Sequence, residues 1–293
     1  MGCSTCNTLV NNRIYEKKAI IKATYDIDGY FESFVCLNIL GYHFVKRNQD
    51  NLKMVIGRRT YEIDDSIRVK KYDISKNDKV LEIIFIGEKI EEMEDLSGMF
   101  DNAHSLIKAD FSLANIKNVK RMNSMFYMCE SLVEFDLSSL NTQNVTTTSN
   151  MFVHCESLVK VDLSSLNIQN VKDIRDMFSN CKNLIKVNFP TLIGYKIENM
   201  DFMFYGCENL IKVDLSSLVG QNIKYMQQMF ADCKRLVKID FSSFKAQKVG
   251  ELIDVFRGCE SEKLLKIKVN RKSYNKNLLR KELGKLKTFL IEI

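Results

Sequence analysis

The chain has 293 residues, of which 45% are hydrophobic and only one is proline, so it is long and apolar enough to fold around a large core. No apolar run reaches the ~20 residues of a membrane-spanning helix, and no secretory signal pattern opens the chain, so we expect neither a membrane span nor ordinary secretion. The net charge of +6 is concentrated in residues 261–293, which carry +7, and this excludes the broad basic surface of a typical nucleic-acid binder.

The first residues read Met1-Gly-Cys-Ser-Thr-Cys6, and removal of Met1 exposes Gly2, the acceptor for myristate. This motif resembles the start of the doubly acylated Src-family kinases, although Cys6 stands where the myristoylation pattern prefers Ser or Thr. The resemblance implies myristate on Gly2 and palmitate on Cys3 and Cys6, and two acyl chains give stable membrane binding. The alternatives are an inert tail, or a CxxC motif for redox or metal chemistry. We expect residues 1–15 to be an acylated, flexible tail.

Residues 16–78 do not follow the period of the rest of the chain and have a β-rich pattern. Ala19–Ile27 is typical of a strand, and Leu52–Ile56 and Thr60–Ile63 flank Gly57-Arg58 as in a hairpin. Because a solenoid needs its first core layer covered, we expect this segment to be an N-terminal capping module. An independent ligand-binding domain is the alternative.

From residue 79 to residue 270, one 26-residue pattern recurs without a slip. A Met-Phe pair, replaced by Val-Phe in the last copy, starts at residues Met99, Met125, Met151, Met177, Met203, Met229 and Val255. A cysteine follows four residues later in every copy except the first, which has Ala103: Cys129, Cys155, Cys181, Cys207, Cys233 and Cys259. A fixed period of this length is the signature of a solenoid, and we expect these cysteines to be reduced, buried core residues.

Each repeat predicts a strand, a turn and a helix. In the third copy, Leu158, Val161 and Leu163 can face the core, while Lys160 and Asp162 alternate onto the other face of a strand. The apolar residues that follow, Val171, Ile174, Met177, Phe178 and Cys181, are spaced by three and four, as on one face of a helix. No unit can bury its apolar face alone, so stacked units are expected to share one core.

The pattern MF..C..L...DLSSL.....V..M resembles the BspA-like branch of leucine-rich repeats, the 26-residue repeat of bacterial surface proteins. The resemblance covers residues 79–270. It implies a right-handed α/β solenoid of strand-turn-helix units with a parallel sheet on one side, and it implies no enzyme activity. Many members of this family are surface proteins proposed to act in adhesion and recognition.

The outward positions of the predicted sheet are the candidate protein-binding residues. They form two neighbouring rows of charge: Lys108, Glu134, Lys160, Lys186, Lys212 and Lys238, and then Asp110, Asp136, Asp162, Asn188, Asp214 and Asp240. Like charges stack one strand apart within each row, and the opposite charges of the neighbouring row offset the repulsion. The rows are therefore either a self-compensated, solvated face or a polar recognition surface.

Residues 271–293 are expected to form a basic C-terminal cap. Tyr274–Leu286 is typical of a basic helix, and Thr288–Ile293 of a closing strand. The charge of this end most simply solvates an exposed terminus, and binding to a membrane surface is a secondary possibility.

Motifs for catalysis are missing from the sequence. None of the three histidines lies in H-E-x-x-H, and no P-loop or G-x-S-x-G is present. His154 beside Cys155 invites a Cys-His nucleophile, but Cys155 belongs to the repeated core position, and the other copies lack this histidine. We expect no enzyme activity, cofactor, metal or small-molecule substrate.

These observations favour a non-enzymatic protein-recognition or scaffold protein that N-terminal acylation tethers to the cytoplasmic face of a membrane. Its partners would be a protein and the membrane, with no nucleic acid. The alternative is a cell-surface adhesion or host-recognition protein of the BspA-like type, for which the sequence shows no export route.

Overall fold

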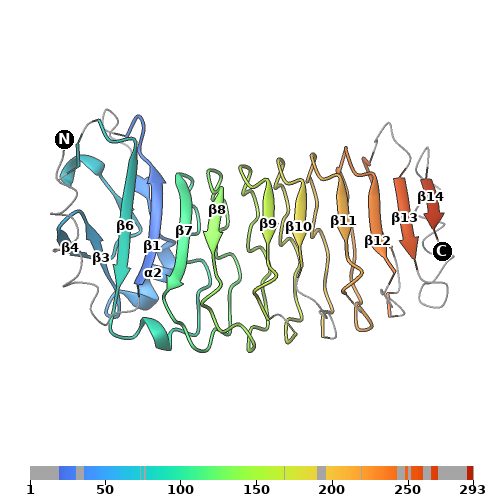
Figure 1. Ribbon diagram of the computed structural model, residues 1–293, viewed down its shortest axis with the longest axis horizontal. Coiled ribbons are helices and arrows are strands. Elements are labelled where there is room, and N and C mark those ends of the chain that lie inside the picture. The colour runs from blue at the N-terminus through green and yellow to red at the C-terminus, as the bar shows by residue number, and fades with distance from the viewer. Residues whose placement is uncertain are drawn as a thin grey trace.

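In the computed structural model, stacked coils of chain form a solenoid with a β-rich module at its N-terminal end (Figure 1). The structure describes residues 20–30, 36–72, 74–75, 77–167, 169–189, 196–218, 220–242, 248–249, 252–259, 265–269 and 289–292. The expected acylated tail, including Gly2, Cys3 and Cys6, lies outside these residues. So does most of the expected C-terminal cap.

The N-terminal module is joined to the repeats through one sheet with the strand order β4-β3-β6-β1-β7-β8. Strand β1 (Ile20–Asp26) lies between β6 (Val80–Ile86) and β7 (Leu106–Leu113) and is antiparallel to both. The first described strand therefore separates β6 from the coils that follow. Its residues Ile21, Ala23 and Tyr25 are fully buried and extend the core of the solenoid into the module.

The predicted strand and hairpin of this module are confirmed. Strands β3 (Lys53–Ile56) and β4 (Arg59–Glu62) pair antiparallel around Gly57, whose φ of 58° suits a tight hairpin turn. The remaining described elements of the module are β2 (Leu37–Asn38), α2 (Tyr42–Asn48), β5 (Ser66–Ile67) and the short 3-10 helix η1 (Val69–Lys71). A second short 3-10 helix, η2 (Ile90–Glu92), follows β6.

The predicted repeat strands are also found, on one side of every described coil. They are β8 (Glu134–Asp136), β9 (Lys160–Asp162), β10 (Lys186–Asn188), β11 (Lys212–Asp214), β12 (Lys238–Phe241) and β13 (Leu265–Val269), and β14 (Phe289–Glu292) follows. Paired strands are parallel and in register with the repeat from β7 to β13, so that Val161 lies beside Val187. Strand β14 pairs parallel with β13, which confirms the predicted closing strand.

The predicted repeat helices are wrong, and the solenoid is built of strands and turns. Within the expected helical run of the third copy, Asp176 and Asn180 have left-handed φ angles of 53° and 59°, which an α-helix does not contain. The same two positions are left-handed through the array: Gly98, Ser124, Asn150, Phe202, Gln228 and Asp254, and Asn102, Met128, His154, Gly206, Asp232 and Gly258. The strand-turn-helix class is therefore corrected to a β-solenoid.

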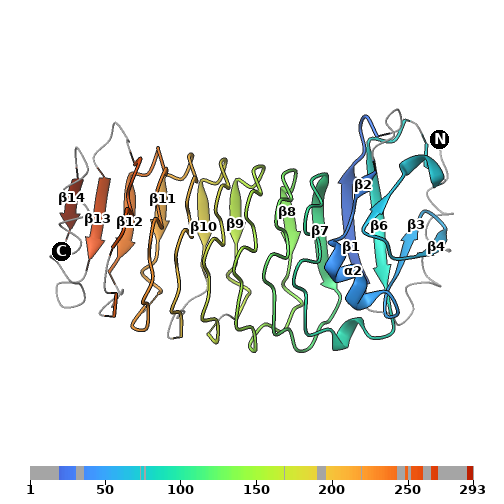
Figure 2. The same ribbon diagram turned by 180° about the vertical axis from the view of Figure 1, so that it is seen from behind.

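Hydrogen bonds between coils explain why no helix forms. The amides of Asp176, Phe178 and Asn180 donate to carbonyl oxygens of the next coil at 2.7–2.9 Å. The intervening amides of Ser179 and Cys181 close tight turns by donating to the residue three positions earlier. A helix would use these same donors within one segment. Stacking instead satisfies them across coils, and in Figure 2 the turn segments of successive coils run side by side.

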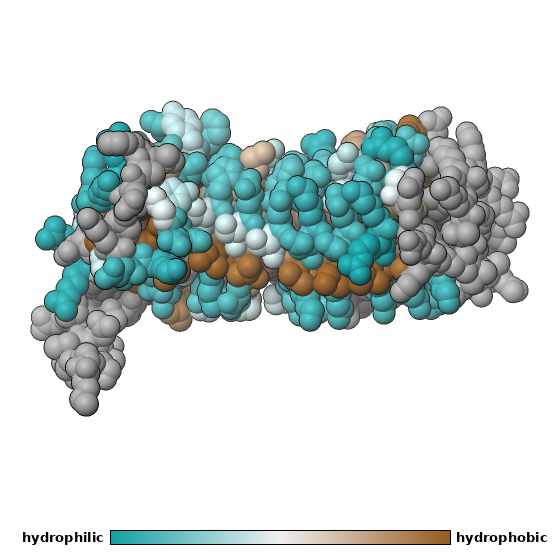
Figure 3. All heavy atoms as spheres, turned by 90° about the horizontal axis from the view of Figure 1, so that it is seen from above, coloured by the Kyte–Doolittle hydropathy of each residue, from teal (hydrophilic) through white to brown (hydrophobic). Residues whose placement is uncertain are grey.

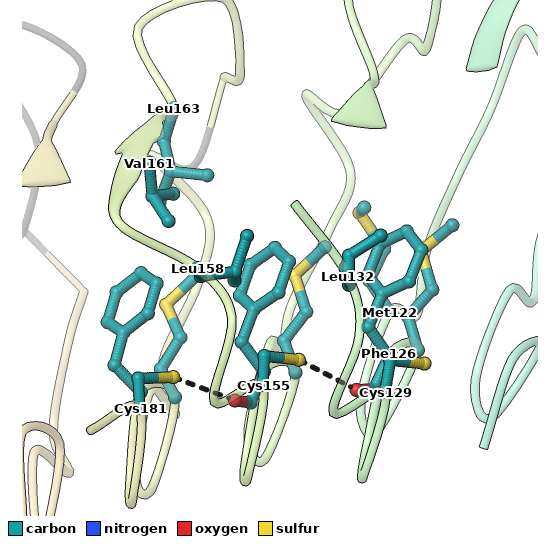
Figure 4. Packing of buried hydrophobic residues seen from close by; sticks show 14 of the residues in the cluster. Met122, Phe126, Cys129, Leu132, Cys155, Leu158, Val161, Leu163 and Cys181 are labelled. Atoms are coloured by element: carbon teal, nitrogen blue, oxygen red, sulfur yellow. Dashed lines mark hydrogen bonds between the residues drawn. The ribbon is translucent and has the colours of Figure 1, made fainter. Parts of the chain in front are cut away.

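The core is organised by columns of identical residues. From Phe100 to Phe230, the phenylalanine rings of adjacent coils lie nearly parallel with centroids 5.4–5.6 Å apart. Figure 4 shows these rings beside the cysteines and leucines of the same coils. Because each ring is fully buried and contacts its neighbours above and below, the coil-to-coil spacing is set inside the core.

The sheet side is interrupted at two places. Its strands pair as β7-β8, β9-β10 and β11-β12-β13-β14, with no strand pairing from β8 to β9 or from β10 to β11. At the first seam, Phe135 occupies the position that is Val161 in the next coil, and its ring packs 5.0 Å from the ring of Phe152.

Candidate functional site

The candidate site is the outer face of the strands from β7 to β12. The structure places the predicted charged residues there as two rows, because paired strands are in register. In the first row, Lys108 lies beside Glu134, Lys160 beside Lys186, and Lys212 beside Lys238. We call Lys160, Lys186, Lys212 and Lys238 the lysine row. The second row is the aspartate row, in which Asp110 lies beside Asp136, Asp162 beside Asn188, and Asp214 beside Asp240.

The aspartate row has a structural role at the ends of the strands. A carboxylate oxygen of Asp162 accepts a 2.9 Å hydrogen bond from the backbone amide of Ser164. Hydrogen bonding by the Ser164 side chain, and then by this amide, lowers the pKa of Asp162. The equivalent bonds, 2.8–3.0 Å long, are made by Asp110, Asp136, Asp214 and Asp240. In the remaining coil the residue two positions on is Pro190, which has no amide hydrogen to donate, and the row there has Asn188.

The lysine row differs in its ion pairing from several other lysines of the solenoid. Lys182 pairs with Glu156 one coil earlier at 2.7 Å, and Lys224 pairs with Glu198 at 2.6 Å, whereas Lys196 and Lys248 bond to asparagine side chains. On the sheet face, Lys108 pairs with Glu134 at 2.8 Å. No ion pair with a described residue is formed by any member of the lysine row. Its ammonium groups are thus available to an external anionic group.

An exposed row of apolar side chains runs beside the lysine row, and the sequence analysis missed it. The residue before each position of the first charged row is Val or Ile, and four of these side chains are more than a third exposed: Val133 (54%), which precedes Glu134, and Val159 (43%), Ile185 (38%) and Ile211 (37%), which precede lysines. We call these four residues the apolar row. Figure 3 shows an apolar band along the length of the solenoid on the face seen from above. The signal in the sequence was the recurrence of Val or Ile at this position with the 26-residue period.

A small cavity opens on the same face at the seam between β8 and β9. Its volume is about 250 Å³, and it is lined by Phe135, Asp136, Leu137, Asp162, Ser164, Ser165 and Leu166. Both carboxylates of this lining already accept backbone hydrogen bonds from Ser138 and Ser164. The cavity is therefore a consequence of the interrupted sheet, with an apolar floor and a polar rim.

The cysteine positions from Cys129 to Cys233 are occupied by buried thiols, as predicted, while Cys259 is partly buried, and each of the six thiols also makes a hydrogen bond. The Sγ atom of Cys155 donates to the carbonyl oxygen of Phe126 at 3.1 Å, and that of Cys181 donates to Phe152 at 3.0 Å (Figure 4). Burial raises the pKa of the Cys155 thiol well above its ordinary value. His154 lies with Nδ1 3.6 Å from Glu156, so the geometry gives no activated Cys155 thiolate.

Two negative observations apply to the described residues. No group of three or more His, Cys, Asp or Glu side chains there is arranged to hold a metal ion. Within the same part of the chain, no helix has the length and apolar character needed to cross a bilayer.

Comparison with known proteins gives a family without an assigned activity. No curated protein matches the chain. A family model described as "Mycoplasma protein of unknown function, DUF285" matches residues 87–190 and 193–277, which together are more than half of the chain. The matched segments contain the repeats that build the solenoid, and this is compatible with the resemblance to BspA-like repeats. The chain therefore belongs to the DUF285 family of Mycoplasma proteins of unknown function.

Proposed function

We propose that this protein is a non-enzymatic recognition or scaffold protein that binds another protein through the outer face of its solenoid sheet. A rigid stack of coils presents a long, regular surface, which suits recognition more than chemistry. The observation that carries the proposal is the lysine row: its four aligned ammonium groups have no ion partner among the described residues, while lysines such as Lys108, Lys182 and Lys224 are paired across coils.

The partner is expected to present acidic groups to this face. Aligned exposed charges accelerate association and make it depend on salt, because their attraction is screened over about 10 Å at 0.1 M ionic strength. The neighbouring aspartate row restricts which acidic partner fits, since Asp162 and Asp214 would repel negative groups placed over them.

A charge reversal tests this proposal. Lys186→Glu with Lys212→Glu should abolish cross-linking to the acidic partner and leave the fold intact, because both side chains are exposed. Lys172→Glu with Lys196→Glu is the matched control, since it changes the net charge equally at two exposed lysines outside the sheet face. Quantitative cross-linking in cells then compares the proteins joined to each variant. If the same proteins are joined equally to all three chains, the sheet face is only solvated.

The place of action that we propose is the cytoplasmic face of a membrane, with myristate on Gly2 and palmitate on Cys3 and Cys6. The support is the motif Met1-Gly-Cys-Ser-Thr-Cys6 alone. Gly2→Ala should move the protein from the membrane fraction to the cytosol, and Cys3→Ser with Cys6→Ser should weaken retention while myristate remains. Unchanged fractionation of Gly2→Ala contradicts the anchor. Digestion by protease added to intact cells would favour the BspA-like surface role instead.

A further inference from the structure

The apolar row and the lysine row form one continuous two-sided surface. In each coil, an apolar-row residue directly precedes its charged neighbour, as Val159 precedes Lys160 and Ile185 precedes Lys186. Side chains of both kinds are exposed there. These valine and isoleucine side chains keep 37–54% of their surface exposed in successive coils, and a recurring exposed apolar surface of this kind is typical of a protein contact.

The spacing along the rows selects the kind of segment that can cover them. The stacked phenylalanine rings of successive coils have centroids 5.4–5.6 Å apart, and paired strands are about 4.8 Å apart. An α-helix has a pitch of about 5.4 Å, so a helix that lies along the solenoid axis brings one turn to each coil. An extended strand returns to the same face only every ~6.7 Å and falls out of step with the coils within a few residues.

The charge of the lysine row determines which side of the bound helix should carry acidic residues. The lysine row lies on one side of the apolar row, and its ammonium groups have no partner among the described residues. A helix whose apolar stripe covers Val159 and Ile185 would place one adjacent flank over Lys160 and Lys186. Acidic side chains on that flank can pair with the ammonium groups while the opposite flank stays in water.

We propose that the apolar row and the lysine row together bind an amphipathic α-helix of a partner protein, which lies along the solenoid axis and carries acidic residues beside its apolar stripe. This inference rests on the proposed recognition function and names its partner. From Val133 to Ile211 the row spans three coil steps, which a helix of about eleven residues covers. An anionic membrane surface fits less well, because the exposed Asp162 and Asp214 lie on the same face and would be pressed against it.

The test uses synthetic helices of about 15 residues with an alanine background. The first peptide has leucines along one stripe and glutamates along one flank. The second peptide keeps the glutamates and replaces the leucines by serine, and the third keeps the leucines and replaces the glutamates by lysine. Fluorescence anisotropy with the purified protein should show binding of the first peptide, with at least about tenfold weaker binding of the other two. Vesicles of phosphatidylglycerol and phosphatidylcholine are measured alongside.

Two protein variants separate this inference from the function on which it rests. Val159→Thr with Ile185→Thr removes apolar contact and keeps β-branched side chains. This double variant should bind the first peptide about tenfold more weakly than the wild type does. Lys186→Glu with Lys212→Glu should weaken binding of the first peptide by a similar factor, and the remaining binding should not depend on salt. Val80→Thr with Leu113→Thr is the matched control, because these side chains are 54% and 55% exposed outside the row, and it should bind as the wild type does.

Each outcome decides between the two claims. Normal binding by the threonine pair together with weak binding by the glutamate pair overturns the apolar row and leaves the recognition function standing. Normal binding by both pairs overturns both. Absence of binding of the first peptide, or vesicle binding that the threonine pair abolishes, shows that no acidic helix is recognised there.

Discussion

The thiol of Cys181 donates a hydrogen bond to the main-chain carbonyl oxygen of Phe152, one coil earlier and 3.0 Å away. The same carbonyl oxygen accepts the amide of Cys155 from its own coil. This bond recurs from Cys129 to Cys259. In the first copy Ala103 takes the position, and there no phenylalanine-containing repeat precedes it. The cysteine thus donates a second hydrogen bond to a carbonyl oxygen of the preceding coil, which an alanine at this position could not donate.

Replacement of Cys181 tests this donor role. Cys181→Ser keeps a donor for Phe152 and should lower the free energy of unfolding by about 1 kcal/mol or less. Cys181→Ala loses both the bond and the volume of the sulfur, and it should cost about 1–2 kcal/mol. Urea unfolding of both variants provides the comparison. If serine proves more harmful than alanine, the position selects for apolar volume and not for a donor.

Alkaline pH should destabilise the protein through the same thiols. Burial raises the pKa of Cys259 to about 12 and raises the pKa of Cys155 and Cys207 well above its ordinary value. A raised folded-state pKa means that the stabilising contribution is full below the unfolded value of about 8.5 and is lost as pH rises above it. Above this value, each buried thiol should lower the free energy of unfolding by up to about 1.4 kcal/mol per pH unit.

Urea unfolding between about pH 7.5 and pH 9.5 measures this effect before most lysines titrate. Cys181→Ser is the internal control, because it removes one titrating thiol and should give a shallower slope. A free energy of unfolding that stays constant over this range would contradict the burial of ionisable thiols in the native state.

A pair of glycine substitutions separates backbone strain from a steric clash. Gly98 and Gly206 both have left-handed φ angles, 62° and 67°, so alanine is strained at each. At Gly206, an added Cβ would lie 2.5 Å from the Asn180 side-chain oxygen, whereas at Gly98 the nearest atom is 3.7 Å away. We expect Gly98→Ala to lower the free energy of unfolding by about 1 kcal/mol and Gly206→Ala to lower it by about 2 kcal/mol.

The excess at Gly206 should vanish in an Asn180→Gly background, because the clashing side chain is then gone and the left-handed backbone is retained. Thermal unfolding of the wild type, Gly206→Ala, Asn180→Gly and the double variant gives the double-mutant cycle that measures this effect. Equal costs at Gly98 and Gly206 would show that neighbouring coils yield to the added methyl group.

Hydrogen exchange should reveal the two seams of the sheet. The amides of Val133 and Ile185 donate to carbonyl oxygens of the preceding coil at 2.9 Å. The equivalent amides of Val159 and Ile211 face the seams, where the described residues provide no such bond. We expect Val159 and Ile211 to exchange at least about tenfold faster than Val133 and Ile185 in NMR measurements. Equal protection of all four amides would mean that the strands pair continuously in solution.

Local sequence pattern determined much of this protein. The fixed 26-residue period predicted a solenoid, and alternation of apolar and polar residues predicted the strands and their register. Lys160 and Asp162 were placed on the outer face, and the cysteines in the core, because these assignments depend only on the period and on the two-residue alternation of a strand. The hairpin around Gly57 followed from turn chemistry in the same way.

The remaining features of the structure depend on how the coils stack on one another. The spacing from Val171 to Cys181 fits a helix, but the amides of Asp176, Phe178 and Asn180 find acceptors in the next coil, and those acceptors exist only after the coils are stacked. The insertion of β1 between β6 and β7 joins strands far apart in the sequence, which no local pattern encodes. The sheet seams and the exposure of Val159 and Ile185 likewise arise from how neighbouring coils pack, because burial and pairing are properties of the assembled array and not of one repeat.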